Sequence, residues 1–186
     1  MVKLIFWGDS HIPYRADKLP EDFIEFLKKE KPEIMVVTGD LVIYEVLEPI
    51  ESLAKKVYAV RGNMDEGKAA KKFPIIEDFE ISGTKISVFH GHGIYPRGDP
   101  LQLCQIARKR NSRILITGHT HMPFVGEYSR IIILNPGSVC GVWGGGGGYG
   151  YPTWGELCID EKVLRVRIFE LRAGMVSIYG QKNFQL

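Results

Sequence analysis

The sequence predicts an α/β fold in which two packed β-sheets are flanked by helices. Over the first third of the 186 residues, apolar strand-like runs alternate with helix-like segments. That order is typical of a parallel sheet with right-handed crossovers. From residue 75 onward, short β runs separated by turns dominate. A parallel half followed by a strand-rich half indicates two sheets that pack against each other.

The first half supplies three predicted strands and two predicted helices. The strands are short, apolar runs of the kind found in buried parallel sheets, at 2–7, 34–38 and 57–60. A helix is predicted over 20–31, where four apolar residues share one side at helical spacing: Leu19, Phe23, Phe26 and Leu27. A second helix is predicted from Pro49 to Lys56.

The second half begins with a predicted antiparallel hairpin, 75–81 and 84–89, joined by a turn at Ser82-Gly83. Asp99 and Pro100 predict the start of a helix over 101–110, with Asp99 as N-cap. The remaining predicted strands are short β runs at 113–117, 124–128, 130–134, 155–159 and 162–171.

Length and composition predict one domain spanning residues 1–186. The formal net charge of +2, from 24 basic and 22 acidic residues, gives no strong nucleic-acid signature. Three scattered cysteines, Cys104, Cys140 and Cys158, favour ordinary buried thiols in a reducing compartment. No apolar run reaches membrane-spanning length, so the sequence predicts a cytoplasmic protein without a membrane partner.

Polar residues gather where the predicted strands end. The five segments concerned are Gly8-Asp9-Ser10-His11, Gly39-Asp40, Gly62-Asn63-Met64-Asp65, His90-Gly91-His92 and Gly118-His119-Thr120-His121. One aspartate after a strand is usually a turn residue or a helix cap. Here, however, all five histidines of the chain lie at strand ends, where sites assemble in α/β sheets. Carboxylate, amide and imidazole groups together suit Mn, Fe, Zn or Ni.

In this order, the motifs D-x-H, G-D, G-N-x-D, H-G-H and G-H-T-H resemble those of the calcineurin-like metallophosphoesterases. The segment N-P-G-S at 135–138 is similar to that of the small single-domain phosphodiesterases of the family. The resemblance spans residues 4 to about 160, nearly the whole chain. It implies a four-layer α/β/β/α sandwich of two mixed β-sheets flanked by helices.

The resemblance also implies a site for two divalent metal ions, whether Mn, Zn, Fe or Ni. One ion would be bound by Asp9, His11, Asp40 and His121, and the other by Asp40, Asn63, His90 and His119. The implied activity is hydrolysis of a phosphate ester, favouring a phosphodiester, by in-line attack of a hydroxide that bridges the metals. The expected partner is a small-molecule phosphate ester such as a nucleotide, and no substrate-binding residue is assigned.

One position departs from the family pattern. Many members carry a histidine after the asparagine, where it can protonate the leaving oxygen, and this chain has Met64 there. Asp65 is then expected to cap the short helix that follows. His92 is left without a metal role, and two roles are open for it: phosphate contact or proton donation, or support of His90. The change at Met64 leaves the preference between monoesters and diesters open.

The glycine run at 144–148 is a second departure. It lacks the lysine and the helix of a phosphate-binding P-loop. It is either a surface loop or a lid beside the metals. As a lid, it would bring four aromatic residues to stack on a base or aryl group: Trp143, Tyr149, Tyr151 and Trp154.

Two other classes of function compete with the enzyme. One is a non-catalytic metal-binding scaffold of the same fold that acts in protein–protein interaction, as the retromer subunit of this fold does. That subunit has lost ligand character at its site, whereas every ligand position is filled here, which favours an enzyme. The other is a nuclease, which would need a basic groove or an added domain, and the near-neutral charge counts against it.

Overall fold

The computed structural model describes residues 1–160 and 163–186. In chain order the elements are β1 (Val2–Trp7), α1 (Glu21–Glu30), β2 (Ile34–Val37), the 3-10 turns η1 (Tyr44–Val46) and η2 (Glu51–Leu53), β3 (Lys56–Ala59), α2 (Gly67–Lys72), β4 (Ile76–Ile81), β5 (Thr84–Phe89), α3 (Pro100–Lys109), β6 (Ile114–Ile116), β7 (Pro123–Tyr128), β8 (Ile131–Pro136), β9 (Thr153–Ile159), β10 (Val163–Arg172) and β11 (Met175–Gln185). No helix in these two ranges is long and apolar enough to span a bilayer.

The described strands form two mixed sheets. The first has six strands in the order β11-β10-β9-β1-β2-β3, and the second has five in the order β4-β5-β6-β8-β7. The predicted parallel half is confirmed, since β1, β2 and β3 pair in parallel. The predicted hairpin is confirmed too, since β4 pairs with β5 in antiparallel register up to Ile81 and Thr84.

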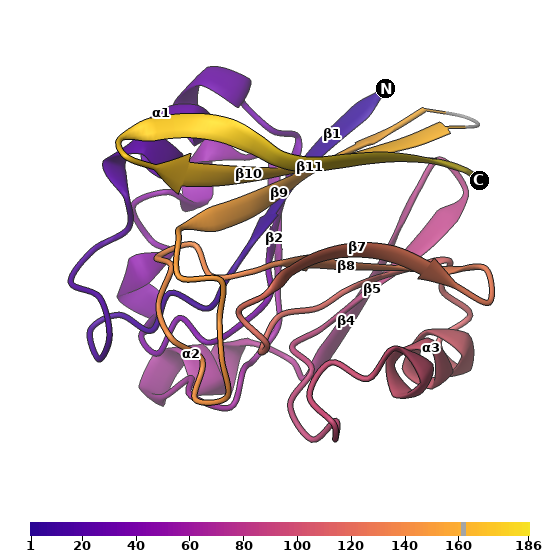
Figure 1. The fold of residues 1–186 in the computed structure, drawn as a ribbon, viewed down its shortest axis with the longest axis horizontal. Coiled ribbons are helices and arrows are strands. Elements are labelled where there is room, and N and C mark those ends of the chain that lie inside the picture. Colours follow the sequence, from indigo (N-terminus) through magenta and orange to yellow (C-terminus); the bar gives the residue numbers. More distant parts are fainter. Residues whose placement is uncertain (161–162) are drawn as a thin grey trace.

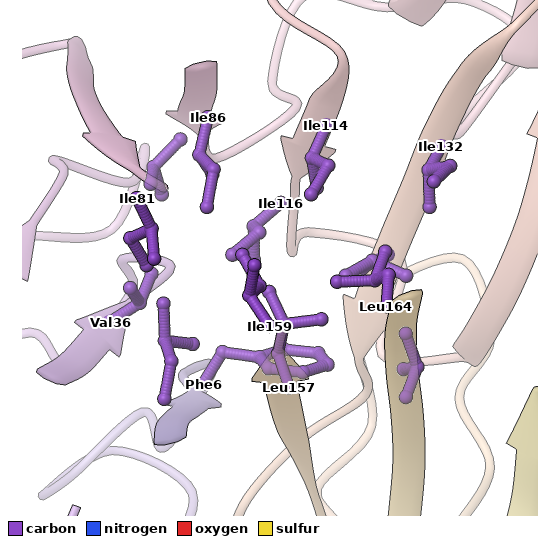
Figure 2. Close-up of a cluster of buried hydrophobic side chains, with 14 of the residues drawn as sticks. Phe6, Val36, Ile81, Ile86, Ile114, Ile116, Ile132, Leu157, Ile159 and Leu164 are labelled. Carbon is purple, nitrogen blue, oxygen red and sulfur yellow. The ribbon is translucent and has the colours of Figure 1, made fainter. Parts of the chain in front are cut away.

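The main core lies between the two sheets. Figure 2 shows Phe6, Val36 and Leu157 of the six-stranded sheet facing Ile86 and Ile116 of the five-stranded sheet. A second apolar cluster packs α1 and the 3-10 turns on the outer face of the first sheet, and a third packs α3 on the outer face of the second. The layers stack as α/β/β/α, with α3 outside the five-stranded sheet in Figure 1, so the predicted four-layer sandwich is confirmed.

The structure corrects one predicted element, adds a strand and bears out another strand over its described residues. The helix expected from Pro49 to Lys56 is wrong: within this segment Glu51–Leu53 forms the 3-10 turn η2, and β3 begins at Lys56. The last strand, β11, was not predicted. It pairs along the whole of β10. Finally, the strand predicted over 162–171 begins at Lys162, which lies outside the described residues, and it is described from Val163.

The sandwich brings the carboxyl ends of both sheets to one edge. Backbone hydrogen bonds join the turns that follow the strands: the Asp9 N–H donates to Gly39 O, and the Gly118 N–H donates to His90 O. The two sheets meet directly where the His119 N–H donates to the carboxylate of Asp9, at 3.1 and 3.2 Å. The fold therefore collects the predicted strand-end residues in one place.

Candidate metal centre

The candidate centre is built from residues with unusual backbone conformations. Asp9, His11, Asp40, His119 and His121 have φ angles of 52°, 51°, 55°, 68° and 57°. Residues other than glycine rarely adopt this left-handed region, and such conformations cluster at functional sites. Each of these turns therefore reverses soon after its strand ends, at Trp7, Val37 or Ile116, and brings a ligand-type side chain into the same space.

The first group consists of Asp9, His11 and His121, whose ligand-type atoms lie within 4.8 Å of one another. His121 Nε2 is 3.2 Å from Asp9 Oδ1 and 3.1 Å from His11 Nε2. All three side chains are buried, with exposed fractions of 2% or less. A carboxylate and two imidazoles in this arrangement make a ligand set for a divalent transition metal.

The second group consists of Asp40, His90 and His119, which also lie within 4.8 Å of one another. His90 Nε2 is 3.2 Å from Asp40 Oδ2. The groups are adjacent, because His11 Nε2 of the first group is 3.5 Å from the same Asp40 oxygen. Asp40 therefore lies between the two groups, as the bridging role predicted for it requires.

Backbone carbonyls fix which nitrogen of two of these histidines faces the centre. His121 Nδ1 is 2.7 Å from Val142 O, and His90 Nδ1 is 2.7 Å from Thr38 O. Because a carbonyl only accepts, both Nδ1 atoms carry the hydrogen and donate it. The Nε2 lone pairs of the neutral rings are therefore directed into the centre, which is the usual arrangement of metal-binding histidines.

One buried nitrogen shows that this donor set fits a cation. His90 Nε2 is buried and has no hydrogen-bond partner among the described residues, although Asp40 is close. Without a metal, the Nε2 atoms of His11 and His121 face each other at 3.1 Å, and His90 must keep a proton to balance the Asp40 carboxylate at 3.2 Å, so the arrangement calls for positive charge among these groups. Divalent ions in the two groups would relieve both contacts, so the residues present fit two metal ions.

The protonation of the centre agrees with that conclusion. Burial lowers the pKa of His11 to about 4, against the pull of Asp40 and Asp9. Burial, and then the charge of His90, lowers the pKa of His119 to about 4. Burial also lowers the pKa of His90, but the Asp40 carboxylate outweighs it and raises the pKa to about 9. At neutral pH, two rings are therefore free to bind, and a cation would displace the proton of the third.

The other two predicted site residues lie outside these two groups. Asn63 follows β3 with an exposed side chain, next to Met64, whose N–H donates to Asp40 Oδ1 at 2.7 Å. His92 is half-buried, with its ring centroid 5.7 Å from that of His90. Burial and the charge of His90 lower the pKa of His92 below its ordinary value. The roles predicted for Asn63 and His92 stay predictions.

The expected role of Asp65 is wrong. Glu66 is the N-cap of α2, and no side chain caps that helix. Instead, the buried Asp65 carboxylate accepts three backbone N–H groups: Oδ2 from Gly62 at 2.7 Å and Asp40 at 3.1 Å, and Oδ1 from Val42 at 2.8 Å. It thereby ties the turn after β3 to the turn after β2. Leaving buried backbone N–H groups without an acceptor costs more free energy than leaving the N–H groups of a solvent-exposed helix start to water, so the carboxylate pairs with the buried turn.

The N-P-G-S segment supports the centre in a way that the sequence did not reveal. Asn135 Nδ2 donates to Gly118 O at 2.7 Å and to Thr120 Oγ1 at 3.1 Å. Ser138 Oγ donates to Asp9 O at 2.7 Å. Both side chains are buried, so the segment holds the backbone of the two turns that carry His119 and Asp9. Polar residues directly after the apolar run at 131–134 were the available signal.

The glycine run packs directly against the centre. A Cβ added to Gly144 would lie 2.7 Å from the His121 ring, so only glycine allows this approach. Arg97 Nη1 donates to Gly144 O at 2.7 Å, and Arg97 Nη2 donates to His119 O. On the other side, Arg15 donates to Trp143 O at 2.6 Å. The glycine run therefore lines one side of the centre, and hydrogen bonds from Arg97 and Arg15 hold its backbone in place.

The aromatic residues around the run do not form one stacking surface. Trp154 is fully buried and packs on Phe23 and Phe169, so its predicted contact with a base is wrong. Tyr149 donates its hydroxyl hydrogen to Glu170 at 2.7 Å. Trp143 and Tyr151 are exposed, with Trp143 the more open of the two at 65% of its surface.

Comparison with known proteins identifies the family. Residues 2–152 match the calcineurin-like phosphoesterase superfamily domain. The chain belongs to this family. A probable metallophosphoesterase of Methanocaldococcus jannaschii is 40% identical over 132 residues, which cover 70% of this chain and 65% of that relative. This chain therefore accounts for about two thirds of the length of that relative. The resemblance inferred from the motifs is confirmed.

Solved structures of similar fold match nearly the whole chain. Vacuolar Protein Sorting 29 from Cryptosporidium parvum superposes with a TM-score of 0.91 and is 28% identical, covering 100% of this chain and 98% of that one. Wild-type Vacuolar Protein Sorting 29 from Entamoeba histolytica, in complex with zinc, has a TM-score of 0.87 at 29% identity, covering 99% of each chain. The fold of the calcineurin-like phosphoesterase is therefore shared with proteins named for sorting.

Proposed function

We propose that this protein is a metal-dependent phosphodiesterase with a two-metal site. Asp9, His11 and His121 hold one ion, Asn63, His90 and His119 hold the other, and Asp40 bridges them. The observation that carries the proposal is the pair of adjacent ligand groups, which Asp40 joins through contacts of 3.5 Å to His11 and 3.2 Å to His90. Family membership supports phosphoester hydrolysis as the reaction.

Different residues of the site would have different roles in the reaction, according to their position. When bound, two divalent ions would lower the pKa of a water molecule and stabilise negative charge on a phosphoryl group. Asp40 offers one oxygen to the space between the groups, while its other oxygen is oriented by the N–H of Met64. The buried carboxylates of Asp9 and Asp40 offset the repulsion between two cations. We propose that His92, whose half-buried ring has a lowered pKa, donates a hydrogen bond to a phosphate oxygen; its ring centroid is 5.7 Å from that of His90.

The donor set narrows the choice of ion. Carboxylates mixed with imidazoles suit Mn, Fe and Zn. Thiolates favour zinc most strongly, but the Cys140 and Cys104 thiols lie elsewhere, where they donate to the backbone carbonyls of Lys18 and Tyr128. The zinc complex of the Entamoeba protein supports zinc as one ion to test. We propose manganese and zinc as the two ions with which activity should first be measured.

Met64 favours diesters with good leaving groups. It is half-buried beside Asp40, where its side chain cannot supply a proton. Protonation of a leaving oxygen typically contributes about 10²–10⁴ in rate. An aryl oxide needs this help least, so aryl phosphodiesters, including nucleotide aryl esters, should be the best substrates.

The test is hydrolysis of bis(4-nitrophenyl) phosphate by protein stripped of metal and then reloaded with Mn²⁺ or Zn²⁺. Activity should appear on reloading, with two ions per chain by metal analysis. Asp40→Asn should lower both the metal content and the rate, because the bridging charge is lost. Full metal occupancy and an unchanged rate in Asp40→Asn would refute the site assignment.

A second candidate is a metal-binding scaffold for protein partners. The specific observation in its favour is the whole-chain likeness to Vacuolar Protein Sorting 29. The same experiment separates the two proposals. Protein that binds two ions but leaves both mono- and diesters of 4-nitrophenol and of nucleotides intact would favour the scaffold.

A further inference from the structure

A cavity of about 300 Å³ lies behind the turn that carries His119 and His121. It is bounded by α3 and by the outer side of the five-stranded sheet, with Leu103, Ile133, Phe124 and Tyr128 among its walls. The first two are fully buried, whereas the two rings are 38% and 37% exposed and stack at 6.2 Å. The cavity thus has an apolar floor and an aromatic mouth, and its volume lies at the lower end of the range for ligand sites.

The charged side chain that lines the cavity is positive. Arg97 lines the cavity, and no aspartate or glutamate does so within the described residues. Its two terminal nitrogens are engaged by carbonyl oxygens, of Gly144 and His119. Its Nε, however, is buried and without a hydrogen-bond partner in the part of the chain that is described. The buried Nε is closed to a ligand, but each terminal nitrogen carries two hydrogens and donates one of them to these carbonyls, so the half-buried guanidinium keeps N–H groups for an anionic acceptor.

The walls of the cavity also hold the metal-binding turn. Thr120, which separates the two histidines, lines it, and so does Asn135, which donates to Thr120 Oγ1 and Gly118 O. Thr117 lines it as well and donates to His90 O at 3.1 Å. A molecule in the cavity would therefore press on groups whose hydrogen bonds fix His90, His119 and His121.

We propose that this cavity binds a small aromatic anion, one or two rings with a single negative group, and that its occupancy is coupled to metal binding. The rings would lie against Phe124, Tyr128 and Leu103, and the anionic group would accept from Arg97. The coupling runs through the Thr120 turn and is reciprocal, so the anion changes metal affinity by the same factor as the metal changes anion affinity. The site is separate from the metal centre and needs no hydrolysis.

The probe is 2-naphthoate, titrated calorimetrically into the metal-free protein, with neutral 2-naphthol as the uncharged counterpart. Saturable binding of one naphthoate is expected, at least tenfold tighter than that of naphthol. Phe124→Ala should weaken naphthoate binding at least tenfold, and Arg97→Met should abolish the preference for the anion. Tyr95→Ala removes an aromatic ring that is 85% exposed and does not line the cavity, so it should leave the affinity within twofold.

A second pair of variants fills the cavity or leaves it open. Leu103→Trp places a larger ring inside, whereas Leu101→Trp makes the same change at a position on α3 that is 64% exposed. Only the first should block naphthoate. If Leu103→Trp does not fold, the comparison of Phe124→Ala with Tyr95→Ala decides the question alone. Equal affinities in those two variants, or no saturation of the wild type, would overturn the proposal.

The coupling is measured separately by titrating Zn²⁺ with and without saturating naphthoate. We expect the Zn²⁺ affinity of one site to change at least fivefold, and the affinity of naphthoate to change by the same factor when Zn²⁺ is bound. Identical Zn²⁺ titrations in the two conditions would refute the coupling, whatever the activity of the protein proves to be.

Discussion

Replacing Asp65 by alanine should destabilise the protein strongly, although Asp65 belongs to neither ligand group. The change removes three hydrogen bonds to one carboxylate, from Gly62, Asp40 and Val42. Hydrogen bonds to charged groups contribute about 1.5–3 kcal/mol each, and an unsatisfied buried donor costs about 1–3 kcal/mol. Burial raises the pKa of Asp65, so part of that gain is offset by the cost of desolvating the carboxylate.

The net loss expected for Asp65→Ala is about 3–5 kcal/mol of unfolding free energy. Asp65→Asn retains the shape and one oxygen. Its best orientation keeps the oxygen on Asp40 and Gly62 and opposes the new amide to the Val42 N–H, so the expected loss is about 1.5–3 kcal/mol. In a domain of this size, each kcal/mol corresponds to about 2–4 °C in Tm. Alanine should therefore lower Tm by about 6–20 °C and asparagine by roughly half as much.

Urea unfolding followed by circular dichroism measures these losses, and metal analysis follows the site. Val42 has a φ of 77°, an outlier for a β-branched residue, so releasing its N–H should also let the Asp40 turn relax and weaken the ion that Asp40 holds. Glu66→Gln is the matched control, since that neighbouring carboxylate is exposed and bonded to the Tyr14 hydroxyl. A change in Asp65→Ala no larger than in Glu66→Gln would refute the reasoning.

Three further changes test other parts of the centre. Gly144→Ala should lower the metal content, because the added Cβ would lie 2.7 Å from the His121 ring. Gly180→Ala is the control, since open space surrounds that glycine and the metal content should not change. Equal metal contents in the two variants would contradict this. Met64→His should raise the rate on alkyl phosphodiesters more than on aryl ones, by up to about 10²-fold, and a plot of rate against leaving-group pKa would show it. The metal-free protein should lose stability as the pH falls from 6.5 to 4, by at most about 3 kcal/mol from His11. The pKa of His11 in the folded protein, about 4, lies below its pKa in the unfolded chain. The unfolded state therefore binds the proton first and is favoured over this pH range. Urea unfolding at pH 7 and pH 4.5 measures this loss, and a His11→Gln variant that loses as much would exclude His11 as its source.

The sequence predicted which residues gather at the candidate centre because their position depends on the strands, and the strands are encoded locally. The runs 4–7, 34–37 and 114–116, which end at Trp7, Val37 and Ile116, are apolar throughout, which is how a strand covered on both faces appears in sequence. Once the strand ends are placed, parallel pairing brings the residues after them together. Six of the seven predicted metal ligands fall into the two groups for this reason.

The sequence did not predict strand β11, and it predicted a helix at 49–56 that does not form. Strand β11 contains Ser177, Gly180, Gln181 and Asn183, so it lacks the alternation that indicates a strand, and it forms because β10 offers a partner edge. The signal was the Ala173-Gly174 pair, whose φ angles of 51° and 72° make a two-residue hairpin turn. At 49–56 the chain forms the 3-10 turn η2 instead of the expected helix, with Ile50 fully buried at its start and β3 beginning at Lys56.

Asp65 shows why the supporting contacts of a site are the hardest part to predict. Its position before a short helix satisfied a local rule for helix caps, and local rules consider only partners a few residues away. The donors that actually hold it, Asp40 and Val42, come from 25 and 23 residues earlier in the chain, on the turn after another strand. Those donors cannot be satisfied by the sheet, because β2 has already ended at Val37. A sharp turn that aims a ligand leaves its own backbone unpaired, and a buried acceptor from elsewhere must complete it. Asn135 and Ser138 supply the converse support at the turns of His119 and Asp9, since they donate to the backbone carbonyls of Gly118 and Asp9. In this fold, therefore, polar residues that lie near a predicted site but have no ligand role are the first candidates for backbone support.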